Sequence, residues 1–229
     1  MSREQLQLSY SEENYLKAIY KLIESGKEKI TTNSISEMVL TSPASVTDML
    51  KRLAEKKLVN YTRYHGVSLT SGGRKSAIAI VRKHRLWEYF LVEKLNYSWD
   101  EVHDIAEELE HIRSESLVNR LSQFLGHPQA DPHGDPIPDE NGNVPVLTLQ
   151  NLTEVGANTP VQVAGVRDHS GEFFRHLGQI GIKNGSSIEI KEVNSFDRSM
   201  SVKIDGVKKQ RFISYDTAMN IMVSPFRKA

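Results

Sequence analysis

The chain of 229 residues contains no cysteine, which excludes disulfide bonds and thiolate metal ligands. It also lacks any apolar run that approaches the roughly 20 residues of a membrane-spanning helix. Its first residues, Met-Ser-Arg-Glu-Gln-Leu, lack the basic start and apolar core of a secretory signal. We therefore expect a cytoplasmic protein with no membrane partner.

The chain also has no net charge, because its 29 Lys and Arg residues balance its 29 Asp and Glu residues. The balance is uneven along the chain. Residues 1–75 hold 12 basic and 8 acidic residues, residues 76–140 hold 6 and 13, and residues 141–229 hold 11 and 8. A basic first segment can attract phosphates, whereas an acidic middle segment can attract cations.

The first 75 residues have the pattern of a DNA-reading module. Apolar residues at helical spacing predict a first helix that ends near Gly26 and a short second helix over about 33–39. Ser42 is placed to cap a third helix, with Pro43 as its first residue and Lys57 near its end. Two short helices joined by a tight turn make a helix-turn-helix pattern, and small hydroxylated residues at the start of the third helix leave room for DNA base edges.

Two alternating segments, 58–64 and 67–70, surround His65-Gly66 and predict a β-hairpin directly after that helix. A hairpin in this position is the wing of a winged helix. We expect DNA contacts from the third helix and the wing, namely from Ser42, Pro43, Ala44, Ser45, Thr47, Asp48, Lys51, Arg52, Arg63 and Tyr64. Further phosphate-facing charge is expected from Lys56, Lys57, Arg74 and Lys75. The alternative is a small helical domain with an ordinary basic surface.

The segment from Lys83 to Arg113 carries a pattern of imidazole and carboxylate groups. His84 and Glu88 lie four residues apart in a predicted helix, so they share one face in apolar surroundings where an unpartnered charge would be costly. A polar stripe at helical spacing follows, formed by His103, Glu107, Glu110 and His111. These groups suit manganese, iron or zinc, so the spacing predicts a metal site. The alternative is a solvated acidic helix face.

The helices of this middle segment also predict a dimer. Ser71 opens a long helix to about Leu95 whose apolar residues cover more than one stripe, as a dimer interface requires. The capping-box pattern from Ser98 to Glu101 predicts the start of the next helix. Ser114 is placed to cap a third helix, which Gly126 ends.

Five of the eight prolines fall between His127 and Pro145, which predicts an extended linker without regular structure. We interpret His133, between Asp131 and Asp135, as a loop residue and not as a metal ligand. From residue 148 onwards we predict a short helix at 172–177, a hairpin turn at 205–206, and strands at 161–166, 187–193, 200–204, 207–213 and 221–223. These strands predict a small barrel.

The ordered motifs resemble those of the iron- and manganese-dependent transcriptional repressors, the family of the diphtheria toxin repressor and the manganese transport regulator. The resemblance spans nearly the whole chain. The matching stretches are Glu13-Asn14-Tyr15-Leu16, the helix and wing from Ser42 onwards, Arg82-Lys83-His84-Arg85-Leu86 with Glu88, Val102-His103-Asp104, and Glu110-His111.

This resemblance implies a fold that is mostly α with small β. It implies an N-terminal winged helix-turn-helix for DNA binding over residues 1–75 and an α-helical metal-binding and dimerisation domain over 76–126. A Pro-rich linker over 127–147 and a C-terminal SH3-like β-barrel, similar to ferrous-transport-A domains, over 148–229 complete the expected order.

Two neighbouring metal positions are also implied by the resemblance. One would be formed by His84, Glu88 and His103, and the other by Glu107, Glu110, His111 and Asn14. Relatives that respond to iron usually have a sulfur ligand at the position of Glu107, whereas manganese-responsive relatives have a carboxylate, and hard oxygen donors suit manganese. Relatives usually have Met or Asp at the position of Asn14, and Lys17 occupies a position that is acidic in some manganese-type members.

The C-terminal domain of longer relatives can donate extra ligands. The two usual donor positions fall here on Gly165, which has no side chain to donate, and on Asp168, which we name as a candidate ligand. Its alternative role is that of an ordinary surface carboxylate.

We therefore expect a homodimeric, metal-activated repressor of metal-uptake genes that binds a palindromic operator in double-stranded DNA. The expected ion is Mn(II), with Fe(II) second, and Zn(II) or another divalent metal can bind in vitro. Two alternatives differ in class. One is a winged-helix regulator that needs no metal, and the other is a metallohydrolase, which would need an open coordination position and a substrate pocket.

Overall fold

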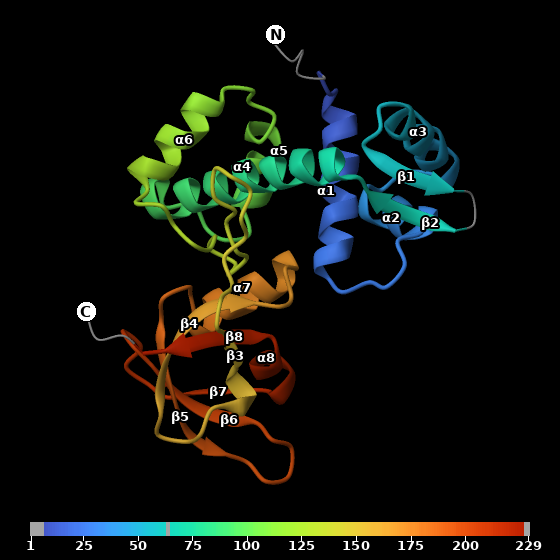
Figure 1. The fold of residues 1–229 in the computed structure, drawn as a ribbon. Coiled ribbons are helices and arrows are strands. Elements are labelled where there is room, and N and C mark those ends of the chain that lie inside the picture. Colours follow the sequence, from blue (N-terminus) through green and yellow to red (C-terminus); the bar gives the residue numbers. More distant parts are fainter. Residues whose placement is uncertain (1–6, 63–64, 227–229) are drawn as a thin grey trace. The chain divides into compact units, whose positions relative to one another are not determined.

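The structure is a computed structural model that describes residues 7–62 and 65–226 (Figure 1). The chain divides into two compact units. The first comprises the chain up to His84 together with residues 107–119 and 138–143, and the second comprises residues 85–106, 120–137 and the chain from Val144. Within the described ranges, no helix is both long and apolar enough to cross a membrane.

Three capped helices and a hairpin make up most of the first unit. They are α1 (Tyr10–Glu24), α2 (Thr32–Met38), α3 (Pro43–Glu55), β1 (Val59–Thr62) and β2 (Gly66–Leu69). Ser9 Oγ accepts from the Glu12 N–H at 3.2 Å, and Glu12 Oε2 accepts from the Ser9 N–H at 2.9 Å, so a capping box starts α1. Ser42 caps α3 and Pro43 opens it, as predicted.

One buried apolar cluster joins these elements, and it includes Leu16, Ile19, Ile35, Val46, Leu50, Leu53 and Val59. The strands β1 and β2 are antiparallel, with Val59 opposite Leu69. Gly73, in the first turn of the following helix, lies so close to the Leu58 backbone that an added Cβ would be 1.8 Å from the Leu58 carbonyl oxygen. The arrangement confirms the predicted winged helix-turn-helix.

Three further helices, α4 (Ser71–Leu95), α5 (Val102–Leu109) and α6 (Glu115–Phe124), contribute residues to both units. The Ser98 N–H donates to Glu101 Oε2 at 3.0 Å, but α5 begins only at Val102, so this predicted capping box closes a turn and does not start the helix. The helix also ends earlier than predicted. Glu110 and His111 lie in the turn after Leu109, and their side chains are buried instead of forming part of a solvated helical stripe.

The second unit contains an antiparallel sheet of six strands in the order β3-β8-β4-β5-β6-β7 (Figure 1). The strands are β3 (Gln150–Asn151), β4 (Pro160–Val166), β5 (Ser187–Val193), β6 (Met200–Ile204), β7 (Arg211–Ile213) and β8 (Ile221–Pro225). Helix α7 (Gly171–Ile180), the 3-10 turn η1 (Leu152–Glu154) and helix α8 (Tyr215–Met219) accompany the sheet. Their apolar side chains form a second buried cluster, which confirms the predicted small β domain.

Two sequence expectations for this region need correction. The strand expected at 207–213 is reduced to Arg211–Ile213, and Val207 packs on the apolar cluster outside the paired residues. The segment 127–147 has no helix or strand, as predicted, but it is not a free extended linker. Asp131, His133 and Ile137 are only 1%, 5% and 4% exposed, because this part of the chain folds into the second unit.

Candidate metal centres and DNA-reading surface

Lys17, on α1, extends its ammonium group into a cluster of carboxylates in the first unit. Its Nζ donates to Glu107 Oε1 at 2.6 Å and to the two carboxylate oxygens of Glu110 at 2.6 and 2.8 Å. His84, on α4, has Nδ1 2.7 Å from Glu110 Oε2. Burial alone would raise the pKa of Glu110, but His84 and Lys17 lower the pKa below its ordinary value. We call these four residues the Lys17 cluster.

His111, expected to share a metal with Asn14, instead meets α1 through Glu13. His111 Nδ1 lies 2.5 Å from Glu13 Oε2, and the imidazole stacks on Tyr10 with ring centroids 4.4 Å apart. Asn14 Oδ1 is buried and accepts no hydrogen bond from the described residues. Sequence reasoning missed Glu13, although it stands beside Asn14 in the stretch that carries the family resemblance.

The Lys17 cluster has some features of a metal site. One potential ligand atom each from His84, Glu107 and Glu110 lies within 4.8 Å of the others. An ion bound to the two carboxylates would lie about 2.0–2.2 Å from their oxygens. That space adjoins Lys17 Nζ, which already donates to both carboxylates, and two cations at such a distance repel strongly. These residues therefore do not fit a metal ion while Lys17 remains paired with them.

A second group of buried ionisable side chains lies wholly within the second unit. Glu88, on α4, has Oε1 3.3 Å from His103 Nδ1 and Oε2 3.7 Å from His133 Nδ1. Asp131 is close to both, so that one potential ligand atom each from Glu88, Asp131 and His133 lies within 4.8 Å of the others. All three residues are buried, and we call them the Glu88 cluster. The joint position of His84, Glu88 and His103 stays a prediction.

The two buried carboxylates of the Glu88 cluster have His133 and Arg85 as their positive neighbours, and Arg85 Nε lies 3.8 Å from Asp131 Oδ2. Burial, then the nearby charges of Glu88 and Asp135, raise the pKa of Asp131 to about 7. Burial alone would lower the pKa of His133, but its contact with Glu88 and the charge of Asp131 raise the pKa to about 9. A proton on His133 therefore balances Glu88 in the metal-free protein.

Hydrogen bonds to the backbone orient the members of this cluster. Asp131 Oδ1 accepts from the N–H groups of His133 and Asp135, both at 2.9 Å. His133 Nε2 lies 3.4 Å from the Trp99 carbonyl oxygen, to which it can donate. Such a bond leaves Nδ1, on the Glu88 side of the ring, as the metal-binding nitrogen, and metal-bound histidines commonly donate through their other nitrogen in this way. These donors fit a divalent transition metal.

Two glycines hold the loop that carries His133 against β4. The Val166 N–H donates to the His133 carbonyl oxygen at 2.8 Å. A Cβ added to Gly165 would lie 2.7 Å from Gly134 Cα and 2.7 Å from the His133 carbonyl oxygen, so the backbones can meet only without side chains. Gly165 has no side chain to donate as a ligand, but its lack of a Cβ lets the loop with His133, a potential ligand, lie against β4.

Asp168, the candidate ligand of the C-terminal domain, accepts from the Ser170 N–H at 2.8 Å. It is not among the described carboxylates and histidines that come together in groups able to hold a metal. Its role as a ligand stays a prediction. The sequence signal for the Glu88 cluster was the Asp131-Pro132-His133 stretch, which we interpreted as a loop, and His133 does lie in a loop but is buried there.

The expected DNA-reading residues of α3 are mostly exposed, from Ser42 to Ser45 and at Asp48, Lys51 and Arg52. Thr47 is partly buried, and its hydroxyl donates to the Pro43 carbonyl oxygen at 2.9 Å. Lys51 Nζ pairs with Asp48 Oδ1 at 3.1 Å on the surface of the helix. Arg63 and Tyr64, expected in the wing, lie outside the described residues.

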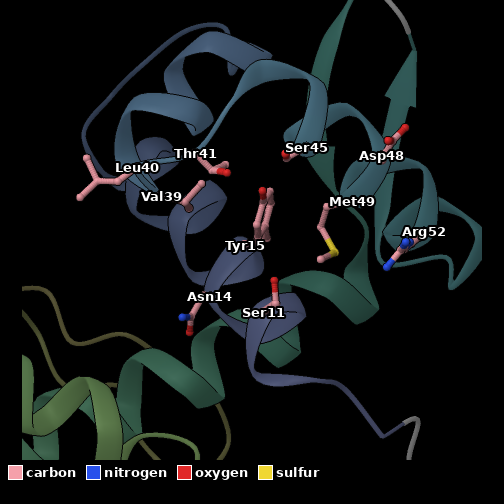
Figure 2. Close-up of a pocket in the computed structure, with 10 residues that line it drawn as sticks. All are labelled: Ser11, Asn14, Tyr15, Val39, Leu40, Thr41, Ser45, Asp48, Met49 and Arg52. Carbon is pink, nitrogen blue, oxygen red and sulfur yellow. The ribbon is translucent and has the colours of Figure 1, made fainter.

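A pocket of about 690 Å³ separates α3 from the start of α1. Figure 2 shows Ser45, Asp48 and Arg52 along the α3 side of this pocket and Tyr15 pointing into it from α1, whereas Leu40 points away. Two of the expected phosphate-facing cations have partners inside the first unit. Lys56 Nζ lies 2.6 Å from Glu12 Oε1, and the Arg74 guanidinium lies 5.4 Å from the centre of the Tyr20 ring.

Three sequence families match consecutive parts of the chain. The family described as "Iron dependent repressor, N-terminal DNA binding domain" matches residues 7–67, and "Iron dependent repressor, metal binding and dimerisation domain" matches residues 70–139. The "FeoA domain" family matches residues 150–225, in agreement with the predicted SH3-like domain.

Individual relatives give the same result. The iron-dependent repressor IdeR of Mycobacterium tuberculosis H37Rv is 37% identical over 158 residues, which cover 66% of this chain and 68% of that protein. The diphtheria toxin repressor of Corynebacterium glutamicum is 34% identical over 189 residues, which cover 78% and 82%. A solved structure of a manganese-dependent transcriptional repressor in complex with manganese is 36% identical, with a TM-score of 0.76, and the match covers 94% of this chain and 100% of that one. ScaR with bound Cd2+ is 33% identical, with a TM-score of 0.68 and coverage of 94% and 99%.

Proposed function

This chain belongs to the iron-dependent repressor family, and from that membership we propose that its DNA binding is switched by a divalent metal held at the Glu88 cluster. Proteins of this family are metal-dependent, DNA-binding transcriptional repressors and not enzymes. The metallohydrolase alternative therefore has no support.

The observation that carries this proposal is the burial of two carboxylates beside one imidazole. Glu88 is 2%, Asp131 1% and His133 5% exposed, so each charge is shielded from water. The raised pKa of Asp131 reflects burial and repulsion from its carboxylate neighbours. When bound, a divalent ion would place positive charge beside both buried carboxylates and would take the place of the proton on His133.

These three ligands would connect segments that are distant in sequence. Glu88 belongs to α4, and Asp131 and His133 belong to the loop that is hydrogen-bonded to β4. Arg85 holds the same loop, because its guanidinium donates to the Pro136 carbonyl oxygen at 2.7 Å. A ligand stabilises whichever arrangement binds it more tightly, so this cluster would favour the state in which α4 and the loop are together.

DNA would be read by two winged helices in a homodimer, because the family has both a DNA-binding and a dimerisation domain. Leu95, Tyr97 and Phe124 are 51%, 40% and 67% exposed, as expected of apolar residues that a second copy covers. A palindromic operator would require recognition helices about 34–36 Å apart, or a multiple of that spacing. Such a regulator acts where the DNA is, consistent with the expected cytoplasmic location.

Manganese is the ion that we propose, with iron second. Two carboxylates and one imidazole form a harder donor set than one that contains sulfur, and the chain has no cysteine. Relatives have been solved with manganese, cadmium and zinc, so binding of a metal in vitro does not identify the physiological one. Excess metal would then repress the genes for its own uptake.

The experiment is DNA binding by fluorescence anisotropy, with the DNA upstream of the protein's own gene and the salt concentration fixed, because salt alone changes such affinities strongly. Wild type and His133→Ala would be compared with chelator, with Mn(II) and with anaerobic Fe(II). We expect tight binding by wild type only with metal, and loss of the metal effect in His133→Ala. Equal binding by wild type in chelator would favour the metal-independent regulator.

A further inference from the structure

The ammonium group of Lys17 uses all of its hydrogen-bonding capacity inside one carboxylate cluster. An ammonium has three donors, and Lys17 Nζ makes three contacts, one to Glu107 and two to Glu110, at 2.6, 2.6 and 2.8 Å. The side chain of Lys17 is 7% exposed and that of Glu110 0%. Lysine is almost never fully buried unless its charge is paired, as it is here.

Neighbouring groups complete the cluster without any added ion. His84 Nδ1 is 2.7 Å from Glu110 Oε2, on the carboxylate that Lys17 also contacts. His111 pairs with Glu13 on α1, four residues before Lys17 and so about one helical turn away. The carboxylates here thus have an ammonium and an imidazole as partners, whereas the partners of the Glu88-cluster carboxylates are imidazoles and the Arg85 guanidinium.

Sequence separation shows what the lysine connects. Glu107 and Glu110 lie 90 and 93 residues after Lys17 in the chain. The ion pair therefore joins α1, the first helix of the winged helix-turn-helix, to the end of α5 and the turn that follows. A metal ion ligated from both sides would make the same connection, but it could dissociate.

We propose that Lys17 is a built-in replacement for a metal ion at this position, so that the first unit holds α1 to the end of α5 at all metal concentrations. The metal response is then left to the Glu88 cluster, and in this consequence alone the inference rests on the proposed function. Removing the ammonium should open the cluster to a divalent ion. Asn14 Oδ1, which is buried and accepts no hydrogen bond from the described residues, would be an additional oxygen donor there.

Mn(II) stoichiometry tests this proposal without any DNA. The full chain would be dialysed against Mn(II), and free Mn(II) would be measured by its electron paramagnetic resonance signal. Lys17→Leu removes the charge and adds no ligand, Lys17→Arg retains a cation, and Lys21→Leu, on the same helix, is the matched control. Circular dichroism would check that each variant is folded.

We expect one Mn(II) per protomer in wild type, Lys17→Arg and Lys21→Leu, and a second Mn(II) in Lys17→Leu. Two ions in wild type, or no gain in a folded Lys17→Leu, would overturn the inference. Should Lys17→Leu fail to fold, Glu107→Gln decides. This variant retains Lys17, so it should still bind one Mn(II) per protomer. A lower Mn(II) count than in wild type would make Glu107 a metal ligand.

The failure of this inference can be told apart from the failure of the proposed function. Glu88→Gln should remove the wild-type ion and leave the gain in Lys17→Leu. If wild type binds no Mn(II) but Lys17→Leu binds one, the Glu88 cluster is not the metal site and the role of Lys17 stands. If wild type binds one ion that Glu107→Gln removes, the role of Lys17 is disproved.

Discussion

The Lys17 cluster and the Glu88 cluster each combine two buried or partly buried carboxylates with a histidine, but they differ in the source of their positive charge. In the first unit a lysine donates directly to Glu107 and Glu110. In the second unit the corresponding charge on Glu88 is met by histidines at 3.3 and 3.7 Å, and His133 can lose its proton. A cation attached to the chain gives a constant connection, whereas a removable proton leaves a place for a metal ion.

The largest effect should come from removing the attached cation. Lys17→Leu leaves Glu110, which is fully buried, without its ammonium partner. Breaking a buried ion pair from one side typically costs about 3–5 kcal/mol, and we expect a loss of that order in the free energy of unfolding in chelator. Urea denaturation measures this loss, and added Mn(II) should recover part of it in the variant. A loss under about 0.5 kcal/mol, as expected for Lys21→Leu, would mean that the pair is not structural.

A glycine substitution should weaken the other cluster without touching a ligand. The Cβ of Gly165→Ala would lie 2.7 Å from the His133 carbonyl oxygen, so the loop must shift from β4. Displacing a group that positions a ligand commonly costs about 10–100-fold in metal affinity. Competition with a Mn(II)-binding indicator measures the change.

Gly178→Ala is the matched control, because an added Cβ in that turn of α7 meets nothing within 4 Å. It should leave the affinity unchanged. Equal affinities for both variants would show that the loop does not depend on this close approach.

The response to pH should also separate the clusters. The pKa of His133 is raised from 6.5 to about 9, so its contribution to the stability of the metal-free protein is complete below pH 6.5 and is lost as the pH rises through 9. The pKa of Asp131 is raised from 3.8 to about 7, so the cost of its charged form develops between those two pH values, mostly below the range in which His133 loses its proton. The free energy of unfolding in chelator should therefore fall by about 1–2 kcal/mol between pH 6.5 and 9.

Metal affinity should move in the opposite direction, because binding requires deprotonated ligands. Mn(II) affinity should rise over that pH interval, and isothermal titration calorimetry in buffers of different ionisation enthalpy should detect released protons. In His133→Ala both the proton release and most of the stability change should disappear. Unchanged release in that variant would place the proton elsewhere.

The smallest effect is expected from a substitution on the DNA-reading surface, which should change neither the Lys17 cluster nor the Glu88 cluster. Lys51 is exposed, and its pair with Asp48 is worth little in water. If Lys51 contacts one phosphate, Lys51→Ala should lower the slope of log affinity against log salt by about 0.9 and leave Mn(II) affinity as in wild type. Altered Mn(II) affinity would mean that the surface and the metal site are not separate.

The local parts of this fold could be predicted from the sequence because their signals are local. Ser42 and Pro43 mark the start of α3 by capping chemistry alone, and the alternation around His65-Gly66 marks the hairpin. Helical periodicity, however, extended α5 through His111, whereas the helix ends at Leu109 because Glu110 turns into buried ion pairs.

Long-range pairings account for what the sequence did not reveal in the candidate sites. The sequence marks Lys17 only as an unusual residue, since nothing near it indicates contact with Glu110, 93 residues away. His133 was interpreted as a loop residue because prolines surround it, and its burial depends on Gly165 of a distant strand. The residue types were visible in the sequence, but their partners were set by tertiary packing.

Operator binding by three proteins at fixed salt tests the central claim most directly. Wild type, Glu88→Gln and Glu107→Gln would be titrated with Mn(II), and DNA binding would be followed by fluorescence anisotropy. We predict metal-activated binding in wild type and Glu107→Gln, and none in Glu88→Gln. Activation that survives in Glu88→Gln and is lost in Glu107→Gln would contradict the account, because the responsive metal would then lie beside Lys17.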